Sequence, residues 1–211
     1  MNDSETSGRT QARQAILAAA DELFCERGYD ATTTREIADR SGVNKALIHY
    51  YFKTKEALFE SVLDQYYERL AEVVLGALSS EGTVRDRLHR LLDAYYDFLA
   101  ANRNFSRIVQ RETSSGPLVE RAERHVLPLF EAGIAVMLEA QPAFREGPLA
   151  ASQLLISFYG MLSSYFTYAD VITRLVGEDP FSAEAFAQRK AHVHRMLDLV
   201  LDAVEREAQG E

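Results

Sequence analysis

The sequence contains a single cysteine, Cys25, among 211 residues. One cysteine excludes an intrachain disulfide framework and fits a reducing compartment. No apolar run reaches the roughly 18 residues that a membrane-spanning helix needs, and the polar first residues lack the apolar core of a secretory signal. We therefore expect a cytoplasmic protein with no membrane partner. We expect Cys25 to be a buried thiol, with a redox sensor as the alternative.

Patterns typical of β-strands and of catalytic sites are also missing. There is no sustained alternation of polar and apolar residues, no Asn-Gly hairpin, no Gly-x-Ser-x-Gly, no glycine-rich phosphate loop and no cysteine cluster. His192 and His194 lack the i, i+4 spacing of two metal ligands on one helix face, and His89 and His125 are isolated. We expect an all-α protein that is not an enzyme and holds no cofactor or metal. A helical enzyme with scattered catalytic residues and a helical protein-binding module are the alternatives.

The most informative segment runs from Thr33 to Phe52 and has the pattern of two short helices around a glycine turn. Thr33 and Glu36 have the spacing of a capping box at the start of the first helix. Gly42 suits the left-handed residue that ends this helix, and Asn44 is a favourable N-cap for the second. A helix-turn-helix of this kind lays its second helix in the major groove of DNA.

The rest of the chain is expected to be helical between short loops. The first helix should run from about Thr10 to Arg27, with an inward face of Ile16, Ala20, Leu23 and Phe24. Later helices are expected at about 55–78, 83–101, 105–112, 118–139 with a break or kink at Pro128, 147–168, and 183–207. The predicted domains are a disordered tail at 1–9, a helix-turn-helix domain at 10–60 with its motif at about 33–52, and a helical domain at 61–211.

Positive charge is scarce but locally concentrated. The net charge is −9. The segment Ala31–Lys55 nevertheless carries five basic and two acidic residues, a net charge of +3, which leaves −12 for the remainder. Because salt screens charges beyond roughly 10 Å, a basic segment on an acidic body can still approach phosphates. An ordinary solvated face is the alternative.

The segment from about Arg13 to Phe59 resembles the N-terminal domain of the TetR/AcrR family of bacterial repressors. The rest of the chain matches this family only in being long and helical. The matching residues are Ala20, Leu23-Phe24, Gly28-Tyr29, Ala31-Thr32, Ile37-Ala38, Ser41-Gly42-Val43, Ile48, Tyr50-Tyr51-Phe52 and Lys55-Glu56-Ala57-Leu58.

The resemblance implies a set of DNA-contacting residues. Lys45 and His49 are the candidates for base edges, with Lys45 directed to guanine. Leu47 and His49 depart from the commoner family residues, so the operator sequence stays open. Tyr51 has a packing role as its alternative. The full predicted set is Thr33, Arg35, Lys45, Ala46, Leu47, His49, Tyr50, Tyr51 and Lys55.

The resemblance also implies a homodimer that binds a palindromic operator in double-stranded DNA. In this family the last two long helices of each subunit pack as a four-helix bundle across a two-fold axis, and both helices here are rich in apolar residues. A monomer with a thick core is the alternative. The predicted interface is Leu155, Phe158, Leu162, Phe166, Val193, Met196, Leu197, Val200, Leu201 and Val204.

Finally, the resemblance implies that a small-molecule effector binds between the C-terminal helices and releases the repressor from DNA. The abundance of Phe and Tyr favours a hydrophobic or aromatic effector, although an aromatic stripe also fits an ordinary core. The candidate pocket residues are Tyr95, Tyr96, Phe98, Arg107, Gln110, Arg111, His125, Met137, Tyr159, Met161 and Tyr165.

Overall fold

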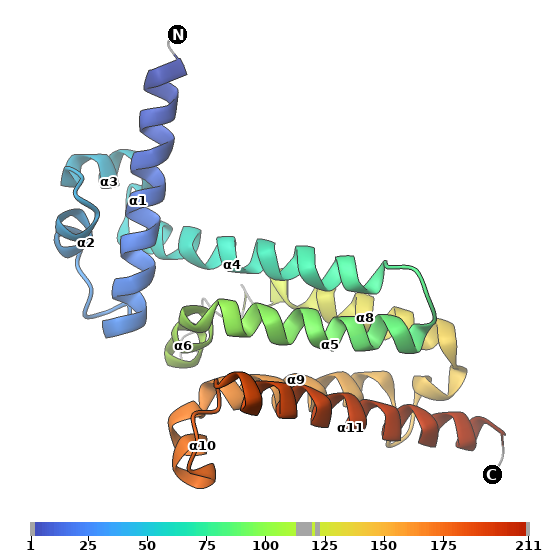
Figure 1. Ribbon diagram of the computed structural model, residues 1–211. Helices are drawn as coiled ribbons and strands as arrows, with labels where there is room; N and C mark the ends of the chain where they lie inside the picture. Colours follow the sequence, from blue (N-terminus) through green and yellow to red (C-terminus); the bar gives the residue numbers. More distant parts are fainter. Residues whose placement is uncertain (1–2, 113–119, 121–122, 210–211) are drawn as a thin grey trace. The chain divides into compact units, whose positions relative to one another are not determined.

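The computed structural model describes residues 3–112, 120 and 123–209, and within these ranges every regular element is a helix (Figure 1). This agrees with the predicted all-α class. None of the described helices is long and apolar enough to cross a membrane. The chain divides into two compact units, and each is described by itself.

The first unit is built around the predicted helix-turn-helix. It contains α1 (Asp3–Arg27), α2 (Thr34–Ser41), α3 (Lys45–Phe52), the first part of α4 (Lys55–Leu78) and most of α6 (Arg103–Glu112). The predicted inward face of α1 is confirmed, because its four residues are at most 2% exposed. The α2 and α3 helices add Ile37, Ala38, Ile48 and Phe52 to the same core. Cys25 is buried beside them, as expected.

The N-terminal helix is longer than predicted. The sequence analysis expects a disordered tail over residues 1–9, whereas α1 already begins at Asp3. The prediction rested on the polar composition of this terminal segment. Extending a helix that is already anchored by a buried face needs no new nucleus, so the polar residues continue it.

The first unit also extends beyond the predicted boundary at residue 60. It includes the chain up to Glu68 and the residues of α6 from Asn104 onward. Asp21 of α1 joins these segments: one carboxylate oxygen accepts from the Tyr66 hydroxyl at 2.7 Å, and the other accepts from the Asn104 amide at 2.8 Å. Phe105 packs on Tyr66 with ring centroids 5.2 Å apart. Such long-range contacts are not visible in local sequence patterns.

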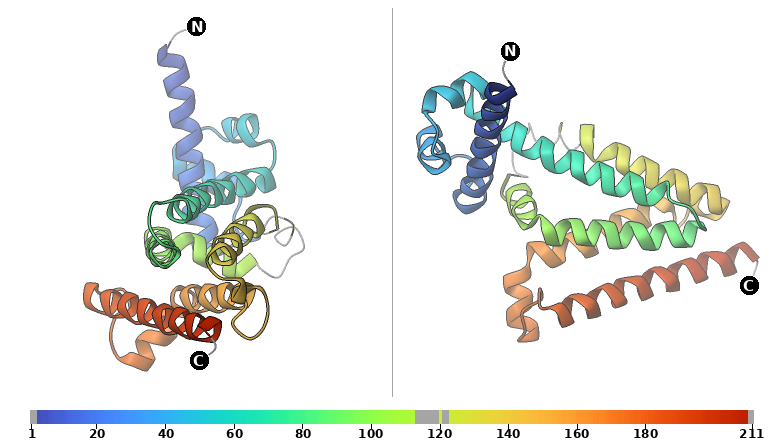
Figure 2. Two further views of the ribbon diagram at one scale, coloured as in Figure 1. Left: turned by 90° about the vertical axis from the view of Figure 1, so that its right-hand side faces the viewer. Right: turned by 45° about the horizontal axis from the view of Figure 1, so that its top comes forward.

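The second unit is a bundle of the remaining helices (Figures 1 and 2). Its elements are the end of α4, α5 (Val84–Ala101), α8 (Leu127–Ala140), the 3-10 helix η1 (Pro142–Arg145), α9 (Ala151–Thr167), α10 (Ala169–Val176) and α11 (Ala183–Gln209). Pro128 stands in the first turn of α8, which confirms that it divides the predicted helix. Part of the predicted stretch 118–126 lies outside the described residues.

Two boundaries in this unit differ from the predictions. The helix expected to begin at Gly147-Pro148 begins at Ala151, because the Gly147 carbonyl accepts from the Ala150 amide and closes a turn with Pro148 at its second position. The sequence patterns also leave residues 169–176 unassigned, although they form α10. This segment is rich in β-branched residues with a modest helix propensity and has no buried residue, so its pattern is weak.

The α5 and α11 helices are joined by a ladder of polar side chains spaced four residues apart. The rungs run in the order Arg85, His89, Asp93 and Asp97 on α5, against Asp202, Asp198, His194 and Lys190 on α11. At its centre the Nδ1 atoms of His89 and His194 lie 2.5 Å apart, and the Nε2 atom of each ring faces a carboxylate across the ladder. The sequence suggests that His89 is isolated, but in the structure it is part of this ladder.

This ladder predicts an acid-sensitive second unit. The hydrogen bond from His89, with help from Arg85, lowers the pKa of Asp198. Burial alone would raise the pKa of Asp93, but hydrogen bonds from His194 and Lys190 bring it below the ordinary value. Carboxylates with a lowered native pKa stabilise the fold above the unfolded-state pKa of about 3.9, and this stability is lost as the pH falls through the native value.

We expect the melting temperature to fall when the pH is lowered from about 5 to about 3. The Asp198→Asn variant should melt lower at neutral pH and lose less on acidification. Thermal unfolding followed by circular dichroism measures both, with Asp170→Asn, an exposed carboxylate on α10, as the matched control. Parallel pH curves for the wild type and Asp198→Asn would contradict a contribution from the ladder.

Candidate nucleic-acid interface and effector cavity

The helix-turn-helix is held in place by the local signals that the sequence contains. The Thr33 hydroxyl accepts from the Glu36 amide at 3.2 Å, and the Glu36 carboxylate accepts from the Thr33 amide at 2.9 Å. Gly42 ends α2 with a φ of 69°, and the Asn44 side chain accepts from the Ala46 amide at 2.9 Å. The predicted capping box, glycine turn and N-cap are all confirmed.

One face of this motif is exposed and carries side chains suited to DNA. We call it the recognition surface and define it by Arg35, Lys45, Ala46, His49 and Tyr50, all of which are exposed. Within the described residues, no ion pair engages Arg35 or Lys45. Their charges are therefore available to phosphates or base edges.

Two other predicted DNA contacts have intramolecular partners. The Tyr51 hydroxyl donates to the backbone carbonyl of Arg9 at 3.0 Å and thereby ties α3 to α1, which favours the packing alternative. The Thr33 hydroxyl donates to the Glu36 carboxylate at 2.8 Å, so this hydroxyl is engaged in the helix cap and a DNA phosphate would have to compete for it. Leu47 is only partly exposed.

Lys55 has a structural position that the sequence does not indicate. Its ammonium group donates to the backbone carbonyls of Tyr29 at 2.8 Å and Thr32 at 3.0 Å, and it lies 4.1 Å from the centroid of the Tyr29 ring. These contacts close the loop between α1 and α2 against the start of α4. The predicted phosphate contact would have to compete with these three interactions.

We therefore expect Lys55→Met to act mainly on stability. Losing the ammonium leaves two carbonyls short of a charged donor, and the free energy of unfolding should fall by about 1–3 kcal/mol. Lys53→Met removes an exposed ammonium from the same region and should change stability by less than about 0.5 kcal/mol. Urea unfolding measures both variants. If Lys55→Met weakens DNA binding but leaves the free energy of unfolding unchanged, the result would support the predicted contact between Lys55 and a DNA phosphate.

The electrostatics of this unit refine the simple charge count. Arg40 is paired with Glu22 at 3.0 Å and Glu26 at 3.2 Å, and Arg27 is paired with Glu36 at 2.6 Å. The hydrogen bond from Arg40 lowers the pKa of Glu26, which keeps this pair ionised. Arg40 therefore contributes little net positive charge to the surface.

Three cations near the motif were not among the predicted site residues. Arg9 and Arg13 are exposed on α1, and the Arg13 guanidinium lies 5.4 Å from the centroid of the Phe52 ring at the end of α3. Lys53 follows Phe52, and its ammonium lies 5.6 Å from the centroid of the Tyr50 ring. The i, i+4 spacing of Arg9 and Arg13 is a signal that could have found them.

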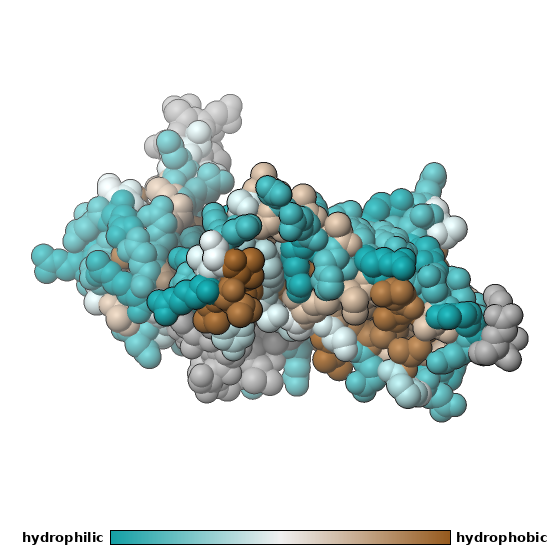
Figure 3. Space-filling model, turned by 60° about the horizontal axis from the view of Figure 1, so that its bottom comes forward, coloured by the Kyte–Doolittle hydropathy of each residue, from teal (hydrophilic) through white to brown (hydrophobic). Residues whose placement is uncertain are grey.

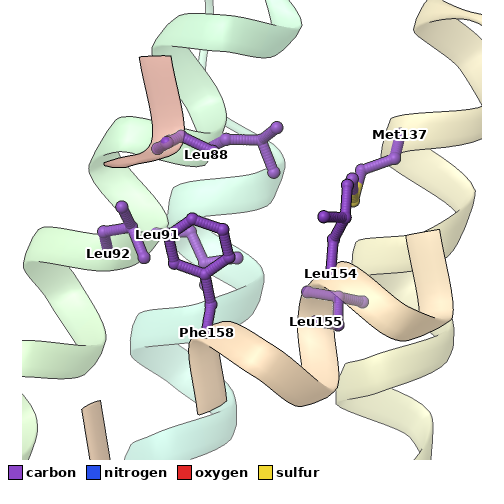
Figure 4. Close-up of a pocket in the computed structure, with 8 residues that line it drawn as sticks. Leu88, Leu91, Leu92, Met137, Leu154, Leu155 and Phe158 are labelled. Atoms are coloured by element: carbon purple, nitrogen blue, oxygen red, sulfur yellow. The ribbon is translucent and has the colours of Figure 1, made fainter. Parts of the chain in front are cut away.

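The second unit contains a small apolar cavity of about 30 Å³ that is partly open to solvent. Side chains from α5, α8 and α9 point toward this common space (Figure 4). A cavity of this size holds about one water molecule and is dry when its walls are apolar. The lining residues are Leu88, Leu91, Leu92, Met137, Leu154, Leu155, Phe158 and Leu197.

Of the predicted pocket residues, only Met137 lines this cavity. Tyr96 and Phe98 are buried, and the Tyr96 ring packs on Phe166 and Phe186 at centroid distances of 5.2 and 4.6 Å. Burial raises the pKa of Tyr96 well above its ordinary value, as expected for a core phenol. The core alternative is therefore correct for these two aromatics.

The other predicted pocket residues lie at several places. The Tyr95 and Ser163 hydroxyls are 3.0 Å apart, and the Tyr165 hydroxyl donates to the Pro180 carbonyl at 2.8 Å. Tyr159 is 43% exposed and packs on Phe130. Met161 and His125 are partly exposed, Arg107 is exposed on α6 in the first unit, and the side chains of Gln110 and Arg111 lie outside those described.

Most of the predicted dimer residues pack inside one chain. Six of them are at most 7% exposed, so they belong to its core: Leu162, Phe166, Val193, Leu197, Leu201 and Val204. Leu155 and Phe158 line the cavity. Val200 is partly exposed, and Met196 is 37% exposed.

The stripe on α11 therefore faces inward. The leucines of α5 and α9 that line the cavity were not predicted, although Leu88, Leu91 and Leu92 have the i, i+3, i+4 spacing of an inward helix face.

Comparison with known proteins agrees with this architecture. Residues 16–62 match the family described as bacterial regulatory proteins, tetR family. The chain is 37% identical over 91 residues to the transcriptional activator FasR of Mycolicibacterium smegmatis, covering 43% of this chain and 42% of that protein. It is 32% identical over 112 residues to the repressor KstR2 of Rhodococcus jostii, covering 51% and 53%. The chain thus spans about half the length of the curated relatives it matches.

Solved structures match over more of the chain. A tetR-family regulatory protein from Rhodococcus RHA1 has a TM-score of 0.68 and 23% identity, covering 92% of this chain and 96% of that one. The ketosteroid regulator KstR2 of Mycobacterium tuberculosis has a TM-score of 0.67 and 19% identity, covering 90% and 93%. At these identities the likeness concerns the fold.

A capped helix-turn-helix with an exposed cationic surface, joined to a separate helical unit, defines a helix-turn-helix protein. Residues 16–62 carry the N-terminal domain of the tetR family of bacterial regulatory proteins, and the chain is similar to transcriptional regulators over about half of its length.

Proposed function

We propose that the protein is a ligand-responsive, DNA-binding transcriptional regulator that acts as a homodimer on a palindromic operator. The observation that carries this proposal is the recognition surface, in which Arg35 and Lys45 are exposed while the apolar side of α3 is buried. An exposed helix of this kind can enter the major groove, and its cations can contact base edges and phosphates. An activator and a repressor both occur among the relatives, and we favour repression.

The DNA-binding proposal can be tested with duplexes from beside the protein's own gene. Binding followed by fluorescence anisotropy should be strongest at low salt, and the logarithm of the affinity should fall linearly with the logarithm of the salt concentration. No binding to any duplex at low salt would overturn the proposal and favour a protein-binding role for the helix pair.

The dimer surface that we propose uses the exposed sides of α9 and α11. Exposed apolar side chains lie on both helices: Ile156 is 58% exposed on α9, and Met196 and Leu199 are 37% and 45% exposed on α11. Seen from the side of these helices, hydrophobic residues gather in two clusters on a mainly hydrophilic surface (Figure 3). The α10 helix adds Leu175 at 83% exposure. A second copy would remove these groups from water.

The effector that we propose is apolar, and its site is the cavity of the second unit. The cavity walls carry only aliphatic, thioether and phenyl groups, so they offer no partner for a charged or strongly polar ligand. The walls must move apart for any ligand larger than water to enter. In this proposal, such opening between helices couples effector binding to DNA binding, and a coupling of about 1–3 kcal/mol is sufficient to shift operator occupancy.

An apolar effector predicts a chain-length effect on stability. Decanol should raise the melting temperature, ethanol at equal concentration should not, and decanol should also weaken binding to the operator duplex. The Leu91→Phe variant fills part of the cavity and should reduce the shift. If decanol raises the melting temperature of the wild type and of Leu91→Phe equally, decanol binds outside this cavity.

A further inference from the structure

The side chain of His49 is held in one orientation on the recognition surface. It is exposed on α3, while its neighbour Ile48 is buried, and its ring nitrogen Nδ1 lies 2.8 Å from the backbone carbonyl oxygen of Lys53. A carbonyl oxygen can only accept a hydrogen bond, so Nδ1 carries the proton. In the neutral imidazole the other nitrogen, Nε2, is then unprotonated and presents a lone pair.

The carbonyl that fixes this tautomer is itself constrained. Lys53 has a φ of 62° and a ψ of −52°, and it is the one residue other than glycine with positive φ among those described. The Thr54 amide donates to the Phe52 carbonyl at 2.6 Å across this residue, which forms a γ-turn of the strained type. The Lys53 amide also donates to the His49 carbonyl at 3.0 Å. The turn thus directs the Lys53 carbonyl toward the ring.

We propose that His49 is a specificity residue that accepts a hydrogen bond, through Nε2, from the exocyclic amine of adenine or cytosine in the major groove. This inference rests on the proposed DNA-binding function. In the major groove only adenine N6 and cytosine N4 offer donors, whereas guanine O6 and N7 and thymine O4 offer acceptors. A nitrogen with a bare lone pair therefore selects adenine or cytosine and disfavours guanine and thymine at the position it contacts.

Protonation removes this selection. In the imidazolium ion both ring nitrogens donate, so Nε2 then suits guanine, thymine or the N7 acceptor of adenine and no longer suits cytosine. Histidine changes charge between pH 5 and 8, whereas lysine, arginine and tyrosine ordinarily do so above this range and carboxylates below it. A base preference at this position that differs between pH 8 and pH 6 is assigned to His49 only if the His49→Ala protein loses it. The charged and titratable groups on the surrounding helices are Arg9 and Arg13 on α1, Arg35, Glu36 and Asp39 on α2, and Lys45, Tyr50 and Lys53 on or next to α3.

The tautomer can be tested on the full-length protein without DNA. Long-range nitrogen–proton correlation spectra at pH 8 should show His49 protonated at Nδ1 and bare at Nε2, and the His49→Ala spectrum identifies its signals. The Lys53→Gly variant keeps the carbonyl and should keep the tautomer. A bare Nδ1 and a protonated Nε2 in the wild-type protein would overturn the proposal.

The base preference is tested on a duplex that the wild-type protein selects. Each base pair of one half-site is replaced in turn, and the dissociation constants are measured at pH 8 and pH 6. At one position, replacing adenine or cytosine should cost the wild type about tenfold at pH 8 and clearly less at pH 6. The His49→Ala protein should lose this discrimination. The control Lys45→Ala should weaken binding to a similar extent at both pH values.

Two results overturn the inference in different ways. If His49→Ala binds the selected duplex and keeps the base preference and pH dependence of the wild type, the DNA-binding function is supported but His49 does not recognise a base. If the wild-type protein selects and binds no duplex at all, the proposed function fails and the inference falls with it.

Discussion

Replacing Lys45 by glutamate is expected to weaken binding to the operator duplex by roughly a hundredfold, or about 3 kcal/mol. Lys45 is the first residue of α3, and it is exposed without an ion pair among the described residues. The substitution removes a donor to guanine and places a carboxylate against the phosphate backbone, where like charges repel. Because the side chain is exposed, the melting temperature should hardly change.

The matched control for Lys45→Glu makes the same change of charge elsewhere. Arg174→Glu reverses an exposed cation on α10 in the second unit and should alter the affinity by less than about threefold, since salt screens distant charges. Anisotropy titrations at one fixed salt concentration compare the two variants. Equal losses would mean that overall charge, and not the recognition surface, controls binding.

The second large effect is expected at the proposed dimer surface. Leu199→Asp places a carboxylate on the exposed side of α11, and the two-fold symmetry of a homodimer brings it into the interface twice. Burying unpaired charges costs several kcal/mol, so the dimer should dissociate roughly a thousandfold more readily. Sedimentation at micromolar concentration should change from a dimer to a single 23.7 kDa species.

Leu127→Asp provides the control for this interface. Leu127 is 51% exposed on α8, comparable to Leu199, but it lies on neither of the two helices assigned to the interface. The control should remain dimeric and bind the operator, whereas Leu199→Asp should lose most of its affinity together with its second half-site contact. A monomeric wild-type protein would refute the homodimer before any variant is made.

The motif was predictable because its determinants are local. Thr33, Gly42 and Asn44 each act on backbone groups within a few residues, so their spacing alone defines the two helices and the turn. The intramolecular contacts of Lys55 and Tyr51 were not predictable because their partners, Tyr29 and Arg9, lie 26 and 42 residues away. An amphipathic helix also says only that one face avoids water. It cannot say whether the inward stripe of α11 meets its own chain or a second copy.

The cavity of the second unit was not predicted, for a related physical reason. Polar and aromatic residues on apolar helices attract attention as ligand contacts, but Tyr96 and Phe98 fill space in the core. The cavity is instead lined by leucines such as Leu88 and Leu92, which are the ordinary residues of any helical interior. A cavity arises from how side chains from three or more helices fail to fill a space, and such a misfit leaves no local pattern.

The most direct test of the account is selection of bound duplexes from a random library, followed by sedimentation of the selected complex. We predict two inverted half-sites whose centres are about one helical turn, roughly 34 Å, or a multiple of it apart, together with two protein chains on a symmetric duplex. Enrichment of no sequence at low salt, or of a single half-site bound by one chain, would contradict the account of a dimeric, operator-binding regulator.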